Sequence, residues 1–265
     1  MKSILAPFFS ALRFLTNIDV PFWREDWSKE DSPKQFTRSL IYYPLVGLII
    51  GLILAAVYWL ADSWVPPILT SAVIVALLAW LTGALHLDGF ADCADGVAAS
   101  HKDEATRDRI MKEPGVGAMA VIAVIILLLL KFAALCAISD EVMIKALIVT
   151  PVLSRWAMAM MVYIFPYKRK SGMGQMLKEL RAPYVIIVPT IVTLIITLLA
   201  FSWMSIVIMA LAAFSMLMCA FFYRSKLQGL SGDTYGAANE VTEAVIFIFF
   251  ALQIFSSWGF GFAIV

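Results

Sequence analysis

The chain has 265 residues, of which 62% are hydrophobic and 15% are charged. Soluble domains carry about 25% charged residues, so this composition excludes an ordinary water-soluble domain. The formal net charge of +1 argues against nucleic-acid binding through bulk electrostatics. The three cysteines, at positions 93, 136 and 219, form neither a disulfide framework nor a CxxC zinc motif.

An N-terminal helix is the first predicted element. Apolar residues recur at helical spacing within the first 20 residues: Ile4, Leu5, Phe8, Phe9, Leu12 and Leu15. This pattern predicts an amphipathic helix that lies in the membrane interface. A re-entrant segment is the alternative.

Long apolar runs follow this helix. No acidic or basic residue occurs between residues 184 and 223. Because a span needs roughly 20 residues at a rise of 1.5 Å, this stretch predicts two transmembrane helices. The same reasoning along the chain predicts an all-α integral membrane protein, a single polytopic domain over residues 1–265 with about seven transmembrane helices. They are expected at 41–61, 66–87, 115–138, 142–165, 184–202, 203–223 and 242–263.

The Lys and Arg residues are distributed one-sidedly along this pattern. Seventeen of the 20 lie in the N-terminal arm or in the loops after the second, fourth and sixth predicted spans. By the positive-inside rule, this places the N-terminus in the cytoplasm and the C-terminus outside. We therefore expect a multi-pass protein of the cytoplasmic (inner) membrane whose polar segments, 82–117 and 224–243, face the cytoplasm.

The polar segment 82–117 contains three regularly spaced aspartates. Asp88, Asp92 and Asp95 stand at i, i+4 and i+7, so a helix would place their carboxylates on one face. Crowded carboxylates raise one another's pKa unless a cation neutralises them, and hard oxygen ligands of this kind suit Mg²⁺. The spacing predicts a Mg²⁺ site with these three ligands; a solvated acidic helix end is the alternative.

A second polar segment covers residues 224–243. Gly232 and Asp233 lie in a glycine-rich stretch, which predicts a flexible loop whose free N–H groups could cradle a nucleotide or phosphate. Glu240 and Glu243 lie on one face at the start of the last predicted span and are candidate binding residues. The alternative is that acids at a helix N-terminus are favoured by the helix macrodipole alone.

Three further ionisable residues are candidates for the site. Lys131 and Arg155 fall within predicted spans, where a charge costs roughly 2.5–3.5 kcal/mol on insertion scales, so each should face the bundle interior or a polar cavity. Arg155 could meet a phosphate or an acid, whereas Lys131 could instead snorkel to the outer surface. His86, two residues before Asp88, is a candidate general base or a hydrogen-bonded helix-end residue.

Part of the aspartate segment is similar to the CDP-alcohol phosphotransferase motif. The similarity covers Asp92, Asp95, Gly96 and Ala99, but the Arg expected next is Ser100, and the later aspartate pair is absent. A membrane-embedded, Mg²⁺-dependent alcohol phosphotransferase of that type is the alternative enzyme. A transporter is the alternative from another class of protein, and the two basic residues inside the spans would then line its substrate path. It predicts repeat symmetry, and no repeat is visible.

Nearly the whole chain resembles the adenosylcobinamide-GDP ribazoletransferase (cobalamin synthase) family. The resemblance is strongest at H-L-D-G-F-A-D-C-A-D-G, residues 86–96. It also covers R-F-L-T at 13–16, Y-P-L-V-G at 43–47, I-M-K at 110–112, Gly117, Lys131, S-R at 154–155 and G-D-T-Y-G-A-A-N-E at 232–240. The chain departs from the family at 113–115, where Glu-Pro-Gly replaces the usual Asp-Ser-Arg, and at Asn17, near which the family usually has a base.

The resemblance implies a phosphotransferase reaction. A ribose hydroxyl of α-ribazole, or of its 5′-phosphate, would attack adenosylcobinamide-GDP at the phosphate nearer the aminopropanol arm, which releases GMP and forms adenosylcobalamin or its 5′-phosphate. Asp92, Asp95 and His86 are then the expected catalytic residues, and Mg²⁺ on Asp88, Asp92 and Asp95 would bridge the pyrophosphate. The expected substrate- and cofactor-binding residues are Asp233, Gly232, Lys112, Arg155, Lys131, Glu240 and Glu243.

The expected partners are these two substrates and the lipid bilayer. A homo-oligomer, or a complex with other cobalamin-assembly enzymes, would also be compatible with this reading, and no nucleic acid is expected.

Overall fold

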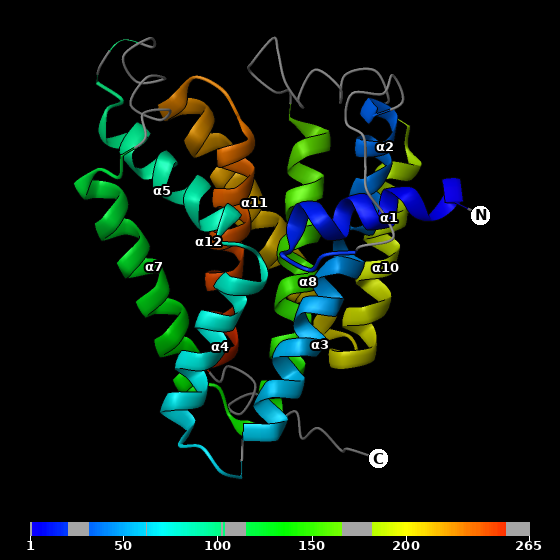
Figure 1. Ribbon diagram of the computed structural model, residues 1–265, viewed down its shortest axis with the longest axis vertical. Coiled ribbons are helices and arrows are strands. Elements are labelled where there is room, and N and C mark those ends of the chain that lie inside the picture. The colour runs from blue at the N-terminus through cyan, green and yellow to red at the C-terminus, as the bar shows by residue number, and fades with distance from the viewer. Residues whose placement is uncertain are drawn as a thin grey trace.

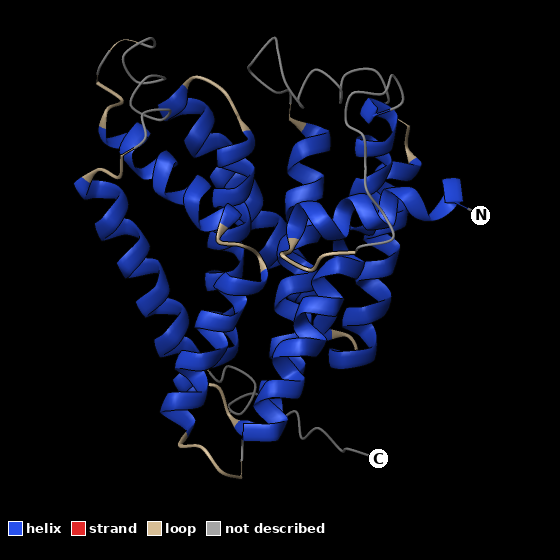
Figure 2. Ribbon diagram, in the orientation of Figure 1, coloured by secondary structure: helices blue, strands red, loops and turns tan. Residues whose placement is uncertain are grey.

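The computed structural model describes residues 2–20, 32–61, 63–101, 103, 115–165 and 182–252. Over these residues the chain folds into helices joined by turns (Figure 2), which confirms the predicted all-α fold class. The helices are α1 (Lys2–Leu15), α2 (Ser32–Ser39), η1 (Leu40–Tyr42), α3 (Tyr43–Ala61), α4 (Pro67–Leu81), α5 (Leu85–Ala98), α7 (Ala118–Ala137), α8 (Asp140–Ile164), α10 (Tyr184–Phe201), α11 (Met204–Leu227) and α12 (Gly232–Ala251).

The number of candidate membrane spans differs from the predicted seven. Among the described residues, five helices are long and apolar enough to cross a membrane, and there are six if α4 and α5 together form one broken span. The five are Gln35–Ala61, Ala118–Ala137, Asp140–Ile164, Tyr184–Phe201 and Met204–Leu227. The last predicted span is not among them, because the first half of α12 carries polar and acidic side chains.

α12 begins ten residues before the predicted start at 242, at Gly232. Ser231 caps the helix reciprocally with Thr234, whose side chain accepts the Ser231 N–H at 2.9 Å, and such a capping box satisfies N–H groups that have no partner within the helix. The helix packs against α5, α7, α8 and α11 in the middle of the bundle (Figure 1). The predicted end of this span, at 263, lies outside the described residues.

The predicted continuous helix 66–87 is broken in the structure. α4 ends at Leu81, and α5 leaves at an angle of 89°. Gly83 and Ala84 both have the left-handed backbone conformation, with φ of 59° and 54°, which ends a right-handed helix. Asn17 stabilises the bend between α4 and α5, since its backbone N–H donates a hydrogen bond to the Leu81 carbonyl at 2.7 Å. The sequence signal for this break was Gly83.

The bend separates an apolar helix from a polar one. α4 runs among the apolar helices, whereas α5 carries the three aspartates toward the end of the bundle at which α2 also lies (Figure 1). At 14 residues and roughly 1.5 Å per residue, α5 is too short to cross a hydrocarbon core of about 30 Å by itself. By itself, α5 is therefore not one of the five candidate membrane spans.

α3 and α8 approach each other very closely at two glycines. Gly47 faces the backbone of Pro151, and a Cβ at Gly51 would lie 2.6 Å from the Ile148 carbonyl oxygen. Small residues allow membrane helices to pack backbone against backbone. This close contact gives a structural reason for the glycine that ends the Y-P-L-V-G sequence.

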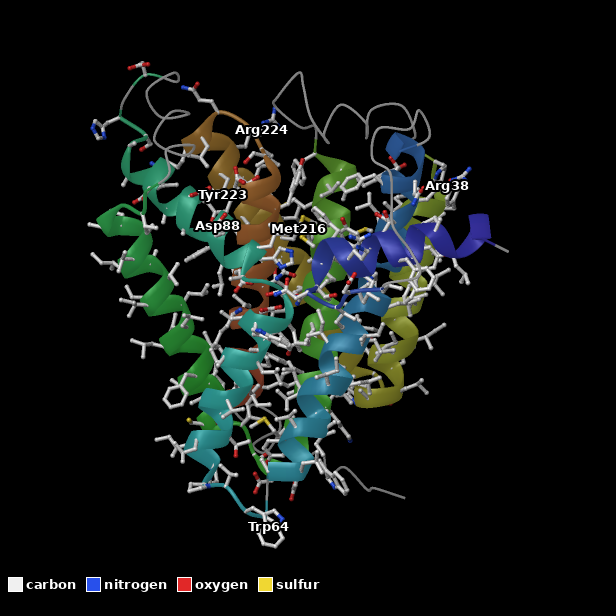
Figure 3. The ribbon with its side chains drawn as sticks, viewed as in Figure 1. Arg38, Trp64, Asp88, Met216, Tyr223 and Arg224 are labelled. Atoms are coloured by element: carbon white, nitrogen blue, oxygen red, sulfur yellow. The ribbon has the colours of Figure 1, made fainter. Side chains whose placement is uncertain are left out.

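The surface and the ends of the bundle agree with a membrane location. Large apolar side chains on α7, α10 and α11 are exposed, as expected for surfaces that face lipid. Figure 3 shows Asp88 and Arg224 toward one end of the bundle and Trp64, which is 87% exposed, at the other. The N-terminal helix α1 is confirmed as a helix and lies across the bundle against α2 and α3. Its placement in the membrane interface stays a prediction, as does the assignment of the cytoplasmic side.

Candidate functional site

The predicted aspartates lie on one helix, and another stripe of that helix packs into the bundle. His86, Gly89, Cys93 and Gly96, spaced by three or four residues, are the buried positions of α5. Between them, Asp88 is exposed and Asp92 and Asp95 are partly exposed. The helix therefore turns its carboxylates toward an accessible surface and its small residues toward its neighbours.

Two glycines bring α5 against α12 with almost no side chain between them. A Cβ at Gly89 would lie 2.8 Å from the Asp233 carbonyl oxygen, and one at Gly236 would lie 3.1 Å from the His86 Cα. This crossing places Asp233, in the first turn of α12, beside the aspartates of α5. Sequence reasoning assigned Asp233 and the three aspartates to one site without predicting that two glycines join them.

The pKa of Asp92 reflects the proximity of the other carboxylates. Burial, followed by the charges of Asp88, Asp233 and Asp95, raises the pKa of Asp92 from 3.8 to about 6. An arrangement of hard, mutually repelling oxygen donors has the chemistry that suits a divalent cation such as Mg²⁺. Among the described residues, no three Asp, Glu, His or Cys side chains stand in a ready ligating arrangement. The residues therefore fit the predicted Mg²⁺ through the chemistry of their oxygen donors, and not through a preformed ligand geometry.

Asp95 has a second role that the sequence did not reveal. Its Oδ2 accepts the Gly117 N–H at 2.7 Å, and its Oδ1 accepts the Ala120 N–H at 2.9 Å. Gly117 immediately precedes α7 and Ala120 lies in its first turn, where N–H groups lack partners within the helix. Asp95 thus caps a neighbouring helix from α5, and its negative charge also lies at the favourable end of that helix's dipole.

Four predicted binding residues form a charge network inside the bundle. The Lys131 Nζ donates to Glu240 Oε2 at 2.6 Å and to Glu243 Oε2 at 2.5 Å, and Arg155 is ion-paired with Glu243. All four side chains are buried. Snorkelling of Lys131 to the outer surface, the alternative considered above, is therefore wrong, because acids on the neighbouring helix hold its ammonium group inside.

The dipole explanation for the two glutamates is also wrong. Because α12 starts at Gly232, Glu240 and Glu243 lie in the helix interior, beyond the first turn. Of the two outcomes considered for Arg155, a phosphate or an acid, the structure shows the acid Glu243.

A residue missed by sequence reasoning joins this network to α5. The Asn239 amide lies 3.3 Å from His86 Nδ1 and 3.4 Å from Glu243 Oε1. His86 is buried, on the packed side of α5 that faces α12, in agreement with a hydrogen-bonded role. The signal for Asn239 was a polar amide next to Glu240 near the start of a predicted membrane span, since polar residues inside membrane proteins often have a functional role.

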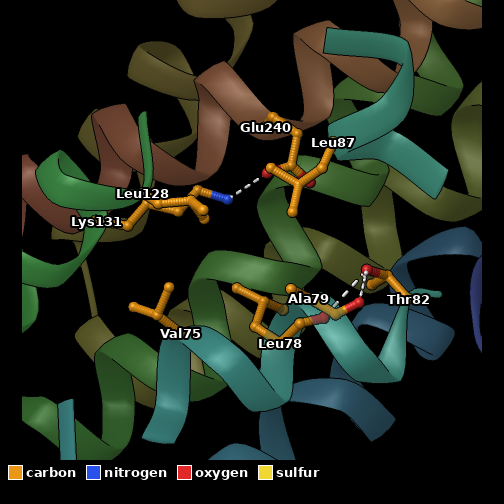
Figure 4. A pocket seen from close by; sticks show the side chains of 8 residues that line it. All are labelled: Val75, Leu78, Ala79, Thr82, Leu87, Leu128, Lys131 and Glu240. Carbon is orange, nitrogen blue, oxygen red and sulfur yellow. Dashed lines mark hydrogen bonds and ion pairs between the residues drawn. The ribbon is translucent and has the colours of Figure 1, made fainter. Parts of the chain in front are cut away.

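A small pocket reaches the edge of the same network. It has a volume of about 210 Å³ with the open space at its mouth included, and Lys131 and Glu240 lie at one side of it (Figure 4). Its other walls come from α4, α5 and α7: Val75, Leu78, Ala79, Thr82, Leu87 and Leu128. Ligand sites for small molecules usually measure about 300–1,000 Å³. The pocket is thus too small to hold a nucleotide or a corrinoid.

The remaining predicted site residues lie at or beyond the edge of the described structure. Gly232 is exposed next to Asp233, whose carboxylate accepts the Ser231 hydroxyl at 3.1 Å. The predicted flexible loop there is in fact the capped first turn of α12. Lys112 lies outside the described residues.

Comparison with known proteins gives one consistent result. The sequence profile of a family described as cobalamin-5-phosphate synthase matches residues 7–251. A protein of Stutzerimonas stutzeri named adenosylcobinamide-GDP ribazoletransferase is 34% identical over 253 residues, which cover 94% of this chain and 99% of that protein.

Relatives with the same name occur in other bacteria. The protein of Pseudomonas putida is 36% identical over 94% of this chain and 100% of its own length. That of Desulfitobacterium hafniense is 35% identical over 90% of this chain and 93% of its own length. No solved structure matches this chain.

Proposed function

The chain belongs to the cobalamin-5-phosphate synthase family, and from this we propose that it acts as an adenosylcobinamide-GDP ribazoletransferase. The substrates are adenosylcobinamide-GDP and α-ribazole or its 5′-phosphate. The ribose hydroxyl oxygen forms a bond to the phosphorus nearer the aminopropanol arm, the bond from that phosphorus to the oxygen of the departing GMP breaks, and the hydroxyl proton is released. The product is adenosylcobalamin or its 5′-phosphate.

The observation that supports this function best is the group of carboxylates at the crossing of α5 and α12. Asp88, Asp92 and Asp95 come from one helix, and Asp233 comes from another whose backbone touches it. Two phosphates and a leaving nucleotide carry negative charge, so carboxylates alone would repel them. The combination of a pyrophosphate substrate and an acidic site is chemically sensible only with a bridging cation.

We propose Mg²⁺ as that cation, held by Asp88, Asp92 and Asp95 beside Asp233. When bound, Mg²⁺ neutralises charge that develops on the phosphates as GMP departs. The protein's own contribution is to hold the carboxylates in fixed positions. Asp92 lies among the other three, and Asp95 is fixed by two backbone N–H groups of α7.

The location of this site supports a reaction at a membrane surface. Asp88 lies in the half of the bundle away from Trp64 (Figure 3), and the long apolar helices would provide the membrane anchor. We propose that this end faces the cytoplasm, as the charge distribution predicts. Nucleotide-bearing substrates would then reach the aspartates from water.

A direct assay tests the function. The protein, purified in detergent and returned to lipid vesicles, is incubated with adenosylcobinamide-GDP, α-ribazole and Mg²⁺, and GMP release is followed. We expect GMP and a cobalamin product in equal amounts, and no GMP when α-ribazole is omitted. GMP release without α-ribazole would indicate a hydrolase, and no release under any condition would contradict the proposed function.

A further inference from the structure

We infer that the buried charges Lys131, Arg155, Glu240 and Glu243 are positioning residues that fix the aspartate-bearing helix α5 through Asn239 and His86. This inference rests on the proposed function and adds to it. It gives these charges a mechanical role, where their residue types alone predicted direct contact with substrate.

The buried charges form a closed network. It contains two cations and two carboxylates, and Lys131 and Glu240 are only 2% and 3% exposed. Glu243 is its centre, since it pairs with both Lys131 and Arg155 and also lies within 3.4 Å of the Ser154 hydroxyl. The charges therefore neutralise each other, and the adjoining pocket of about 210 Å³ is too small to hold either substrate whole.

The network and Asp233 lie on the same face of α12. Asp233, Gly236, Asn239, Glu240 and Glu243 follow one another at intervals of one or three residues and return to the same side of the helix about every turn. The acidic end of this stripe belongs to the candidate metal site, and its other end is locked to α7 and α8 by the ion pairs. The network thereby fixes the height and rotation of α12.

The position of α12 determines that of α5, because the two helices are in close contact. The backbone of α12 touches α5 at Gly236 against His86 and at Asp233 against Gly89, and the Asn239 amide lies 3.3 Å from His86 Nδ1. Because these contacts are largely backbone against backbone, a shift of α12 cannot be absorbed by side-chain rotation. It would move the start of α5, two residues before Asp88.

The network is more polar than a structural role alone requires. Arg155 Nε and Nη2, His86 Nε2 and Asn239 Oδ1 are buried and have no hydrogen-bond partner among the described residues. Such atoms destabilise a fold, so their presence in a folded protein requires an explanation. An apolar packing of the three helices would avoid this penalty, so a requirement of the site is the simpler reason for retaining the charges.

A double-mutant cycle separates positioning from direct binding. Lys131→Met leaves Glu240 as a buried carboxylate without its main partner, and Glu240→Gln leaves Lys131 with reduced compensation. The double variant removes both charges and leaves the balanced pair Arg155 and Glu243. Removing one partner of a buried pair is strongly harmful, whereas removing both is often nearly neutral. The readouts are kcat and the KM values of both substrates in the GMP-release assay.

We expect each single variant to lose at least about tenfold in kcat and the double variant to recover to within about threefold of wild type. If Lys131 and Glu240 touched the substrate, the double variant would be at least as impaired as the worse single variant and would show raised KM values. That result would overturn the inference. If the single variants fail to fold, the double variant is compared with wild type: near-wild-type kcat and KM values indicate positioning, whereas a low kcat with raised KM values indicates direct contact and overturns the inference.

His86→Gln provides an independent test of the link to α5. Glutamine retains a hydrogen-bonding group but cannot act as a titrating base. A positioning role predicts an unchanged shape of the pH–rate profile, with kcat lowered by no more than about tenfold. Loss of the acidic limb together with a fall of about 10²–10⁴ in kcat would identify His86 as the general base and contradict the inference.

Two controls complete the experiment. Glu141→Gln removes an exposed carboxylate at the N-terminus of α8 and should leave kcat unchanged. Wild-type protein that releases no GMP would refute the proposed function itself. An active wild type with an inactive, folded double variant would refute only the positioning role.

Discussion

The carboxylate of Asp95 accepts the backbone N–H of Gly117 at 2.7 Å, so a side chain of the aspartate helix closes the first turn of α7. Gly117 lies so close to this carboxylate that any Cβ at that position would collide with both of its oxygens. The relationship explains why a glycine precedes α7. It also distinguishes Asp95 from Asp88 and Asp92, which make no such capping contact with the residues that the structure describes.

Replacement of Asp95 by Asn should therefore reduce stability as well as activity. An amide can accept only one of the two N–H groups, and its own NH₂ would face the other. Loss of a cap typically costs about 1 kcal/mol, and the favourable charge at the helix N-terminus is lost too. We expect a lowered thermal unfolding midpoint in detergent for Asp95→Asn and an unchanged midpoint for Asp88→Asn. Equal midpoints for the two variants would contradict the capping role.

The crossing of α5 and α12 should not tolerate a side chain at Gly89. A Cβ there would lie 2.8 Å from the Asp233 carbonyl oxygen, and because this neighbour is backbone, one helix must move. Displacement of catalytic groups by about 1 Å can cost about 10²-fold in rate, so Gly89→Ala should lower kcat by about tenfold to a hundredfold. Gly115→Ala is the matched control, because a Cβ at Gly115 would meet nothing within 4 Å. Similar rates for both variants would show that the crossing is not critical.

The corner between α4 and α5 predicts a stabilising substitution. Ala84 has φ of 54°, a left-handed conformation that costs an L-residue roughly 1–2 kcal/mol. Glycine avoids this cost but loses about 0.5–1 kcal/mol through its greater freedom in the unfolded chain. Ala84→Gly should therefore gain about 0.5–1 kcal/mol, seen as a higher thermal midpoint. Ala98→Gly, at the end of right-handed α5, should gain nothing, and an equal gain there would contradict the argument.

The acidity of Asp92 predicts how the metal requirement changes with pH. Burial and the neighbouring carboxylates raise the pKa of Asp92 to about 6, so protons compete with Mg²⁺ below that pH. The Mg²⁺ concentration for half-maximal GMP release should rise about tenfold per pH unit below about 6 and level off above it. An ordinary carboxylate would show this rise only near its usual value of 3.8. A Mg²⁺ requirement that is constant from pH 5 to 8 would refute the coupling.

The same shift has a consequence for the metal-free protein. The folded state retains a proton on Asp92 that the unfolded state has already released between pH 3.8 and about 6. Stability without Mg²⁺ should therefore fall as the pH rises through this range and remain level above it. Saturating Mg²⁺ should reverse the loss, because the cation then compensates the carboxylate charge.

The sequence was sufficient to predict the fold class and several of the membrane helices. The apolar runs predicted α3, α7, α8, α10 and α11 close to their observed positions, because a span without charges has few other ways to fold in a membrane. The spacing of Asp88, Asp92 and Asp95 correctly placed them on one helix. These are local properties of the chain, and local patterns report them well.

The errors arose where contacts between distant segments decide the structure. The corner after Leu81 depends on a hydrogen bond from Asn17, 64 residues earlier in the chain by number. The early start of α12 depends on burial of its polar half among α5, α7 and α8. The burial of Lys131 depends on two glutamates more than a hundred residues away. No periodicity within a single segment contains this information.

The central claim is that the aspartates of α5 support transfer to α-ribazole with release of GMP. Its most direct test is the rate of GMP release by Asp92→Asn protein in lipid vesicles at saturating Mg²⁺, measured beside wild type and Asp103→Asn. Asp103 is an exposed acid beyond the end of α5, so its variant controls for loss of surface charge.

The account predicts that Asp92→Asn inserts normally and loses about 10²–10³ in rate, the typical value of one electrostatic group in a reaction of this kind, while Asp103→Asn retains the wild-type rate. Near-wild-type GMP release by folded Asp92→Asn protein would contradict it.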